Sequence, residues 1–422
     1  MNKLTKITII ILSLTILFVV GCEDRGTNIP VKGEDSFIRT PQDVKIAPMI
    51  HDFSPELNYQ IRNDFRLLEM AIYIPDISLP EPYGPFESVP MLVLLPPQDG
   101  DRYYFFNHGL QQIADELIEN GTIEPMIICC ITNEKVFGGT FYGSSAPVGD
   151  FDEILGNKLI AYLENSLPVM ESPSKRGIGG VGMGAYGAFR TVIKSPGVYS
   201  SISTTDGPLD FDGADGSTGL INLFDDALIE QNLDATSLKD FDTSGVWHIS
   251  RMFVGGALAF SPHDTLVYGH NEVTIDPNTG FEISKAVIDS SLTFSDTLTT
   301  TLVTDLVTAP RNFDFHLPFD GGGNVYLPVW ERWRQNNLER LLAQNSDALG
   351  GVEIKVVSTP QARYGFYNMT TSWVTTIQNP PFNYSVDYET YNGYDGNPAT
   401  HDQYLYKILK DMLIFHSKNF NK

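Results

Sequence analysis

The sequence predicts an α/β fold in which a mostly parallel central sheet is flanked by helices and carries a large inserted cap. Short apolar runs alternate with helical patterns between Met70 and Thr205, which is typical of parallel strands joined by right-handed crossovers. The run Met126–Ile131 is apolar throughout, as expected for a strand that is covered on both faces. The alternation stops over about 211–345, an irregular stretch rich in Asp, Gly and Thr, and then resumes.

The expected strands are short and consist of apolar or small residues. In chain order they are Met70–Ile74, Met91–Leu95, Tyr103–Phe106, Met126–Ile131, Gly177–Val181, Val198–Thr205, Val352–Ser358 and Tyr384–Tyr391. Cys129 and Cys130 are neighbours within the fourth strand, so their side chains point to opposite faces of the sheet. We therefore expect two buried packing residues rather than a strained vicinal disulfide.

The expected helices follow amphipathic spacing and end at helix-terminating residues. They are Ile113–Asn120, which stops at Gly121, Asp152–Asn165, Tyr186–Lys194, and a final helix Asp402–Phe415. The simplest organisation is a signal peptide over residues 1–21, a flexible tether over 22–50, and one α/β domain over 51–422. The irregular stretch 211–345 is then a cap inserted into the connections of the sheet.

The N-terminus has the features of an export signal. Lys3 and Lys6 precede an apolar run, Ile7–Val20, which is shorter than the roughly 20 residues that a membrane span needs. The run ends in Val-Gly-Cys at Cys22, which resembles the lipobox of bacterial lipoproteins. The resemblance implies lipidation of Cys22, a membrane as partner, and a lipid-anchored place in the bacterial cell envelope, with the leaflet left open. An ordinary signal peptide with a chance cysteine is the alternative.

Composition excludes several classes of function. The 422 residues include 28 Lys and Arg against 52 Asp and Glu, a net charge of −24, which argues against nucleic acid as a partner. No zinc or P-loop motif occurs, and three cysteines are too few for a disulfide scaffold. We expect no metal and no cofactor. The acidic segment Asp206–Asp215 matches no calcium-binding loop and is interpreted as a solvated loop, and the histidines at positions 248, 263, 270 and 316 lack ligand spacing.

A glycine-rich segment can be interpreted in two ways. Gly182-x-Gly184-x-x-Gly187 follows a strand and opens a helix, and Asp206 ends the next strand. This matches the dinucleotide-binding fingerprint, in which glycines let a pyrophosphate approach a helix N-terminus. A lone fingerprint is a weak signal, and the segment lies far along the predicted sheet rather than at its first strand. Nucleotide binding is therefore an alternative.

The second interpretation uses more of the chain. From about Ile61 to the C-terminus, apart from the insertion, the sequence resembles the esterase family of the α/β-hydrolase superfamily, the group of esterase D-like and feruloyl esterase-like enzymes. The segments that carry the resemblance are Met91–Pro97, Tyr103–Gly109, Leu117–Ile127, Phe141–Asp150, Lys175–Arg190, Asp206–Asp210 and His401–Asp402. The resemblance implies an α/β-hydrolase fold, places the nucleophile elbow at Gly180–Gly184, and assigns the catalytic histidine to His401.

Two catalytic groups of that family are missing at the matched positions. An elbow reads G-x-S-x-G, but here Gly182 occupies the nucleophile position, and glycine cannot form an acyl-enzyme. The acid that orients the histidine follows the strand matched by Val352–Ser358, where Thr359–Tyr364 contains no carboxylate and Gln361 is the nearest match. Asp387, Glu389 and Asp395 could approach His401 only from other segments. We therefore expect that Gly182→Ser alone restores little activity.

The backbone part of such a site does not depend on the missing serine. The resemblance places the oxyanion-hole N–H groups at Met183 and Leu110. Our first hypothesis is a catalytically degenerate, esterase-like lipoprotein that binds or scaffolds a carbohydrate or ester-bearing ligand. The alternative is an active carboxyl-ester hydrolase with a displaced nucleophile, such as Ser144 or Ser145, or with water activated by His401. Tryptophans 247, 330, 333 and 373 either stack on a ligand or form the core of the cap.

Overall fold

The structure is a computed structural model that describes residues 47–52, 67–75, 88–133, 138–145, 148–213, 218–230, 248–275, 282–293, 313–392 and 400–422. The predicted signal peptide, most of the tether including Cys22, and the residues Asp215, Trp247 and Asp395 lie outside these ranges. No helix in the described part of the chain combines the length and the apolar character of a membrane span.

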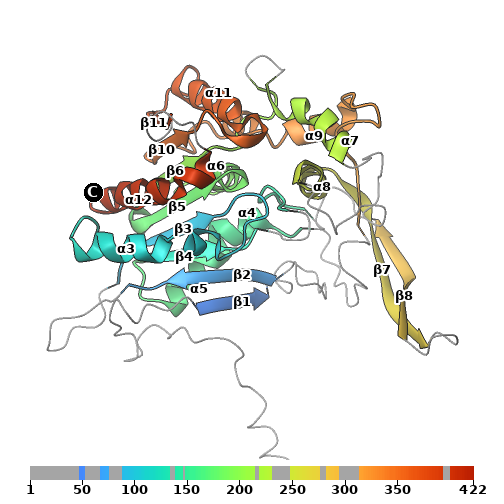
Figure 1. Cartoon of the computed structure of the whole chain (residues 1–422), viewed down its shortest axis with the longest axis horizontal. Helices are drawn as coiled ribbons and strands as arrows, with labels where there is room; N and C mark the ends of the chain where they lie inside the picture. Colours follow the sequence, from blue (N-terminus) through green and yellow to red (C-terminus); the bar gives the residue numbers. More distant parts are fainter. Residues whose placement is uncertain are drawn as a thin grey trace, which may run out of the picture.

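An eight-stranded sheet forms the centre of the molecule, in the order β1-β2-β4-β3-β5-β6-β10-β11 (Figure 1). Six neighbouring strands, from β4 to β11, are parallel, whereas β2 pairs antiparallel with both β1 and β4. This confirms the predicted α/β class with a mostly parallel sheet. The strands are β1 (Ala47–Asp52), β2 (Leu67–Tyr73), β3 (Met91–Leu95), β4 (Ile127–Ile131), β5 (Arg176–Val181), β6 (Ser201–Thr205), β10 (Glu353–Ser358) and β11 (Asp387–Thr390).

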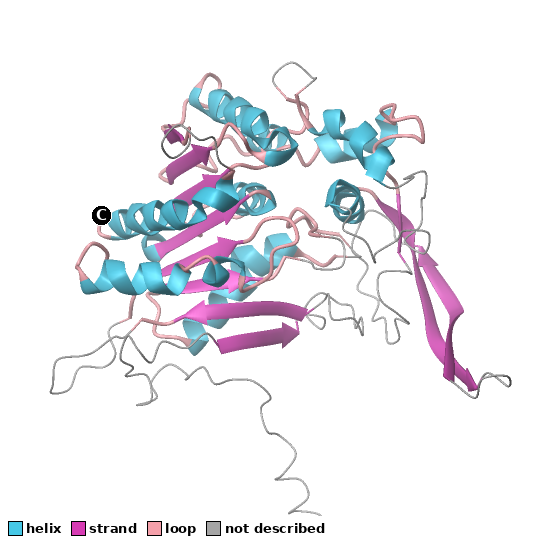
Figure 2. Ribbon diagram, in the orientation of Figure 1, coloured by secondary structure: helices cyan, strands magenta, loops and turns pink. Residues whose placement is uncertain are grey.

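Helices cover both faces of this sheet (Figure 2). On one face α3 and α12 pack together over Leu92, Leu94 and Cys130, and on the other α5, α6 and α11 cover Val93, Cys129 and Ile178. Both cysteines are free and buried, as predicted, and burial raises the pKa of the Cys129 thiol to about 12. The helices of this part are α2 (Tyr104–Asn107), α3 (Leu110–Glu119), α4 (Phe151–Glu153), α5 (Leu159–Ser166), α6 (Met183–Lys194), α11 (Phe366–Gln378) and α12 (His401–Phe420).

The register of the parallel strands brings the carboxyl ends of β5, β6 and β10 to one edge. Val181 pairs with Thr205, and Thr205 pairs with Val357. The residues that follow these three strands are Gly182, Asp206 and Thr359. In an open parallel sheet this edge is the place where sites form.

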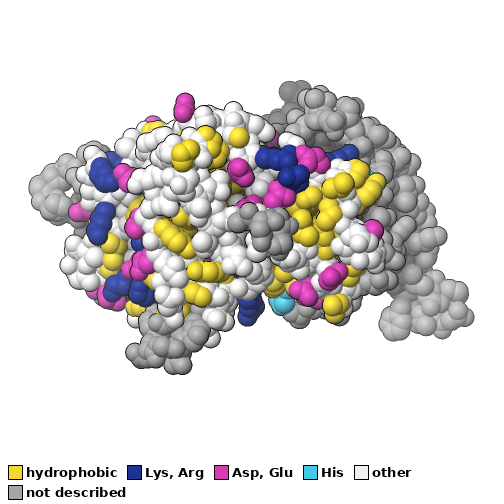
Figure 3. All heavy atoms as spheres, turned by 90° about the horizontal axis from the view of Figure 1, so that it is seen from above, with side chains coloured by type: hydrophobic (Ala, Val, Ile, Leu, Met, Phe, Trp, Pro, Cys, Tyr) yellow, Lys and Arg dark blue, Asp and Glu magenta, His cyan; other side chains and the backbone are white. Residues whose placement is uncertain are grey.

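Between β6 and β10 the chain forms helices over this edge and a separate three-stranded sheet of order β8-β7-β9. The strand pair β7 and β8 extends away from the central sheet (Figures 1 and 2). These elements are α7 (Phe224–Glu230), α8 (His248–Phe260), β7 (Pro262–Ile275), β8 (Glu282–Thr293), β9 (Phe313–Phe315), α9 (Leu327–Arg334) and α10 (Leu338–Gln344). On the face seen in Figure 3, acidic and basic side chains are interspersed.

Aromatic side chains hold the inserted helices together. The Phe224 ring lies 4.5 Å from that of Phe319 and 5.7 Å from that of Trp330, and Trp333 lies against Phe141 and Phe260. Trp330, Trp333 and Trp373 are all buried. Of the two interpretations offered for the tryptophans, these three therefore fit core packing rather than a stacking surface.

One predicted strand is wrong. Tyr103–Phe106 is not a strand, because residues 104–107 form the short helix α2. The side chain of Asp101 accepts a hydrogen bond from the Tyr103 N–H at 2.9 Å, and its carbonyl accepts one from the Tyr104 N–H at 2.9 Å. This turn starts a helix directly before the aromatic run, so local capping overrides the β-propensity of Tyr and Phe.

Candidate functional site

The turn between β5 and α6 has the geometry of a nucleophile elbow without a nucleophile. Gly182 lies between strand and helix with φ 58° and ψ −123°, a conformation that side chains rarely tolerate. A Cβ atom at Gly180 would overlap the carbonyl of Gly184, and one at Gly184 would overlap the carbonyl of Leu95. Both flanking glycines are therefore required by close backbone packing. At Gly182 itself, a Cβ atom would lie 3.0 Å from the Cβ atom of Pro97.

His401 has a carboxylate partner, contrary to the expectation from the sequence. Its Nδ1 atom lies 3.1 Å from Oδ2 of Asp206, and Asp206 is completely buried. The expectation of a missing acid was wrong because the acid follows β6 instead of β10. Since β6 and β10 are neighbouring parallel strands, a carboxylate at the end of either one can reach the same histidine.

The turn after β10 holds the acid in place instead of supplying it. The N–H of Thr359 donates to Oδ1 of Asp206 at 2.8 Å, and the Thr359 hydroxyl donates to Oδ2 at 2.6 Å. These bonds fix the carboxylate so that it can orient the imidazole. Two alternative acids named from the sequence, Asp387 and Glu389 on β11, instead form ion pairs with Lys355 on β10. The third, Asp395, lies outside the described residues.

The other ring nitrogen of His401 faces a second carboxylate. Nε2 lies 3.5 Å from Oδ1 of Asp402, and the hydroxyl of Tyr104 donates to that same oxygen at 2.7 Å. Burial, together with the Asp402 charge, raises the pKa of Tyr104. The hydroxyl therefore stays protonated as a donor. Asp402 is in this way fixed between α2 and the imidazole.

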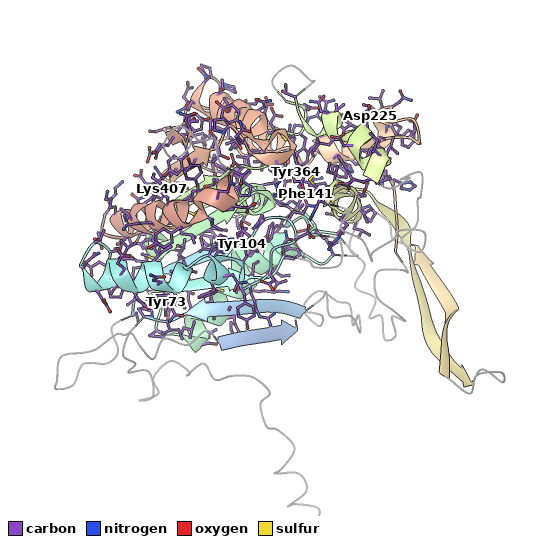
Figure 4. The ribbon with its side chains drawn as sticks, in the orientation of Figure 1. Tyr73, Tyr104, Phe141, Asp225, Tyr364 and Lys407 are labelled. Carbon is purple, nitrogen blue, oxygen red and sulfur yellow. The ribbon has the colours of Figure 1, made fainter. Side chains whose placement is uncertain are left out.

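A cavity of about 250 Å³ joins the elbow to His401. Tyr104 and Tyr364, both labelled in Figure 4, line it from α2 and from the turn before α11. Its remaining walls come from the loop after β3, the elbow, and the first residues of α8, α11 and α12, and they comprise Pro97, Gln98, Asp99, Gly100, Gly182, Met183, His248, Arg363, Phe366, His401 and Asp402. The volume lies just below the roughly 300–1,000 Å³ of drug-sized sites, so the cavity suits a small ligand.

The two predicted oxyanion donors differ in their placement. Met183 is the first residue of α6 and lines the cavity, whereas Leu110 is buried between α3 and α12 and does not line it. The loop after β3 lines the cavity instead, through Pro97, Gln98, Asp99 and Gly100. Within that loop, Asp99 N–H donates to Gly138 and Gly100 N–H donates to Pro97. The Gln98 N–H makes no hydrogen bond within the described residues.

The residues of the other hypotheses are engaged elsewhere. Ser145 donates its hydroxyl to the Leu258 carbonyl at 2.6 Å, and the Ser144 hydroxyl accepts from the Asp152 N–H at 3.0 Å. Neither serine lines the cavity. Both Asp206 oxygens are occupied by Thr359 and His401, so this carboxylate is not available to a ribose. A Cβ atom at Gly187 would overlap Tyr142, which explains that glycine by helix packing.

Residues 74–248 match the model of a protein family described as Putative esterase. The match covers less than half of the 422 residues. The matched segment contains β3, the elbow and Asp206, but not His401. Within the described residues, no group of three or more His, Cys, Asp or Glu side chains is arranged to hold a metal ion.

Several solved structures resemble this chain at low sequence identity. A ferulic acid esterase has 12% identity over 89% of this chain and 98% of its own, with a TM-score of 0.49. The fluorophosphonate-binding serine hydrolase F of Staphylococcus aureus has 9% identity over 89% of this chain and 98% of its own, with a TM-score of 0.48. An S-formylglutathione hydrolase from Agrobacterium tumefaciens has 12% identity over 89% of this chain and 95% of its own, with a TM-score of 0.46. No curated protein matches the chain.

The sequence could have indicated Asp206 but not its role. Its place directly after a strand next to the elbow strand was visible, and so was its distance from the glycine motif. What the sequence does not reveal is that β6 and β10 are neighbours, because the inserted cap separates them along the chain. The sequence also did not indicate that the loop after β3 lines the cavity, because Tyr103–Phe106, which follows this loop, was wrongly predicted as a strand.

Proposed function

We propose that this esterase-like chain is a lipid-anchored binding protein of the bacterial cell envelope, which holds a small ester- or acid-bearing ligand without covalent attack. The observation that carries the proposal is the glycine at the elbow. Gly182 has the backbone conformation of a nucleophile position but offers no hydroxyl. With no attacking atom, acyl transfer through an acyl-enzyme is not available.

The groups that remain suit recognition of a carbonyl or carboxyl oxygen. Backbone N–H groups at the start of a helix and in the loop after β3 form an oxyanion hole in this type of site. Met183 and Gln98 supply such groups at the cavity wall. His401, oriented by Asp206, adds a ring nitrogen that faces Asp402 and the cavity. The ligand is thus held by hydrogen bonds while its ester bond stays intact.

The membrane part of the proposal rests on the N-terminal sequence. Lys3, Lys6 and the apolar run before Cys22 have the order of a lipoprotein export signal. A diacylated and N-acylated cysteine provides more than one acyl chain, as stable anchoring requires. Anchoring would keep the binding domain at the membrane while its ligand is collected from the surrounding compartment.

The test is to measure covalent reactivity and turnover in the wild-type protein. We expect no labelling by a fluorophosphonate probe, no burst of p-nitrophenol from p-nitrophenyl butyrate, and the same residual rate in wild type and His401→Ala. Turnover that depends on His401 and reaches about 1 s⁻¹ or more, the range of ordinary enzymes, would contradict the proposal. Labelling that persists in Ser144→Ala and Ser145→Ala but is lost with His401→Ala would indicate another displaced nucleophile.

A further inference from the structure

The charged groups around the cavity are matched with one exception. Asp99 lies 2.9 Å from Nη1 of Arg251 and 3.0 Å from Nδ1 of His248. Asp402 accepts from Tyr104 and faces His401. Among the residues that the structure describes, no carboxylate lies within ion-pair distance of the Arg363 guanidinium, although this side chain lines the cavity.

Arg363 is presented to the cavity by a constrained turn. Tyr364 has φ 60° and ψ 21°, and Gly365 has φ 69°, so two consecutive residues adopt the left-handed conformation. Such a conformation at a non-glycine residue is uncommon and is often found at functional sites. At its other end the turn is closed by the Ala362 N–H, which donates to the Thr359 carbonyl at 2.8 Å, and Thr359 itself binds Asp206.

The guanidinium acts electrostatically on the interior of the cavity. Burial raises the pKa of both Tyr104 and Tyr364, and in each case the positive charge of Arg363 opposes that rise. The two tyrosines line the cavity, so the field of Arg363 reaches its walls. In a chain with a net charge of −24, an anionic ligand is repelled at long range, and a local cation is needed to hold it.

We propose that Arg363 binds the carboxylate of an anionic ligand, a small organic acid or half-ester whose other end lies against Gly182 and Met183. This inference rests on the proposed binding function and names its ligand class. The planar guanidinium suits a carboxylate because it can donate two parallel hydrogen bonds. The aromatic walls formed by Tyr104, Tyr364 and Phe366 favour a ligand with an apolar or aromatic body.

The experiment compares two probes that differ in charge and little else. Isothermal titration of the purified wild-type chain with 4-phenylbutyrate and with 4-phenylbutyramide measures the contribution of the carboxylate. We expect the acid to bind about tenfold to a hundredfold more tightly than the amide, as for a hydrogen bond to a charged group. Arg363→Gln should remove this preference, mainly by weakening the binding of the acid. Arg363→Lys should give an intermediate preference, because it keeps the charge but loses the paired donors.

Arg340→Gln is the matched control, since Arg340 pairs with Glu331 on the surface and does not line the cavity. It removes the same charge and should keep the full preference for the acid. Equal binding of acid and amide by wild type, or an unchanged preference in Arg363→Gln, would overturn the role of Arg363 while leaving a binding function in place. Failure of wild type to bind either probe at millimolar concentration would overturn both the inference and the proposed function.

Discussion

Gly182 is the single residue in which this site departs most from an acyl-transfer site. The histidine and its buried acid are in place 3.1 Å apart, and the elbow keeps its backbone conformation. The sequence led to the expectation that Gly182→Ser would restore little activity, because no acid was found for His401. The position of Asp206 reverses that expectation.

We predict that Gly182→Ser creates a reactive serine. The hydroxyl would join a histidine that is already oriented, and p-nitrophenyl butyrate turnover should rise by about a thousandfold or more, since loss of a nucleophile costs about 10⁶ in a comparable triad. Pro97 must yield by a few tenths of an ångström, because the new Cβ atom would lie 3.0 Å from its Cβ atom. Fluorophosphonate labelling and steady-state turnover are the measurements.

Two double variants are the controls for this prediction. Asp206→Asn and His401→Ala, each combined with Gly182→Ser, should lose most of the gained rate while the protein stays folded by circular dichroism. A correctly folded Gly182→Ser protein that neither reacts with the probe nor gains turnover would show that the His401–Asp206 pair is not competent. The site would then lack more than the serine hydroxyl.

Asp206 shows at the residue scale what a single sequence can and cannot reveal. That it ends a strand follows from local patterning, and that prediction was confirmed. Its contact with His401 spans 195 positions along the chain and depends on strand order, which local patterning does not contain. Leu110 shows the converse, since a plausible motif match put an oxyanion donor in a helix that faces the core instead of the cavity.

At the scale of elements, α12 connects the site to the core of the sheet. His401 is its first residue, and Gln403 accepts a hydrogen bond from the Thr400 N–H at 2.9 Å, which fixes the start of the helix. Near its other end, His416 is fully buried, with its ring nitrogens 2.8 Å and 2.7 Å from the hydroxyls of Ser201 and Ser203 on β6. Burial lowers the pKa of His416 to about 3.

This buried histidine predicts a loss of stability in acid. In the folded state His416 stays neutral down to about pH 3, whereas in the unfolded chain it gains a proton near pH 6.5. Between these two pH values the unfolded state therefore binds more protons than the folded state. The contribution of His416 to the free energy of unfolding is complete above pH 6.5. It falls as the pH drops, by up to about 1.4 kcal/mol per pH unit. Urea denaturation of wild type and His416→Gln at pH 7.0, 6.0 and 5.0 measures it.

The variant supplies the comparison in that experiment. His416→Gln should be less stable at pH 7.0, because its side chain cannot satisfy both serines with the same geometry, but its stability should fall less steeply toward pH 5.0. Parallel pH profiles for the two proteins would contradict the assignment to His416. Other titrating groups contribute equally to both profiles and so cancel in the difference.

Most strands of the central sheet could be predicted from the sequence, whereas α2 was mistaken for a strand and β1 and α11 were not predicted. The apolar runs that became β3 and β4 and the amphipathic pattern that became α12 each carry a strong periodic signal. Residues 104–107 lack one, and their helix depends on a turn made by the preceding Asp101. The elements of the insertion, such as α8 and the β7–β8 pair, were not predicted individually, because the stretch 211–345 was interpreted as irregular.

At the scale of the whole molecule, the net charge bears on the proposed lipid anchor. Removal of Lys3 and Lys6 with the proposed signal peptide would change the net charge from −24 to −26. Anionic lipids repel such a body, so a lipid on Cys22 would hold the domain by its tether and not by its surface. The domain and its cavity would then face the solvent.

We predict that Cys22→Ala releases the chain from the membrane. After cell fractionation, wild type should be found in the membrane pellet and should move to the detergent phase on Triton X-114 partitioning, whereas the variant should be found in the aqueous phase. Lowering the ionic strength should not return the variant to anionic vesicles, because electrostatic attraction is absent. Membrane association of Cys22→Ala that persists in high salt would contradict lipid anchoring.

The elbow conformation has a consequence for the history of this site. A serine at φ 58° and ψ −123° is strained by about 1–3 kcal/mol, whereas glycine adopts that conformation with far less strain. A change from serine to glycine at this position would therefore also relax the fold. If catalysis was no longer under selection, glycine would be retained for stability alone, and a return to serine would be opposed at every step. At an elbow of this conformation, a change from serine to glycine would thus be easier to make than to reverse, even where a histidine and an aspartate remain in place.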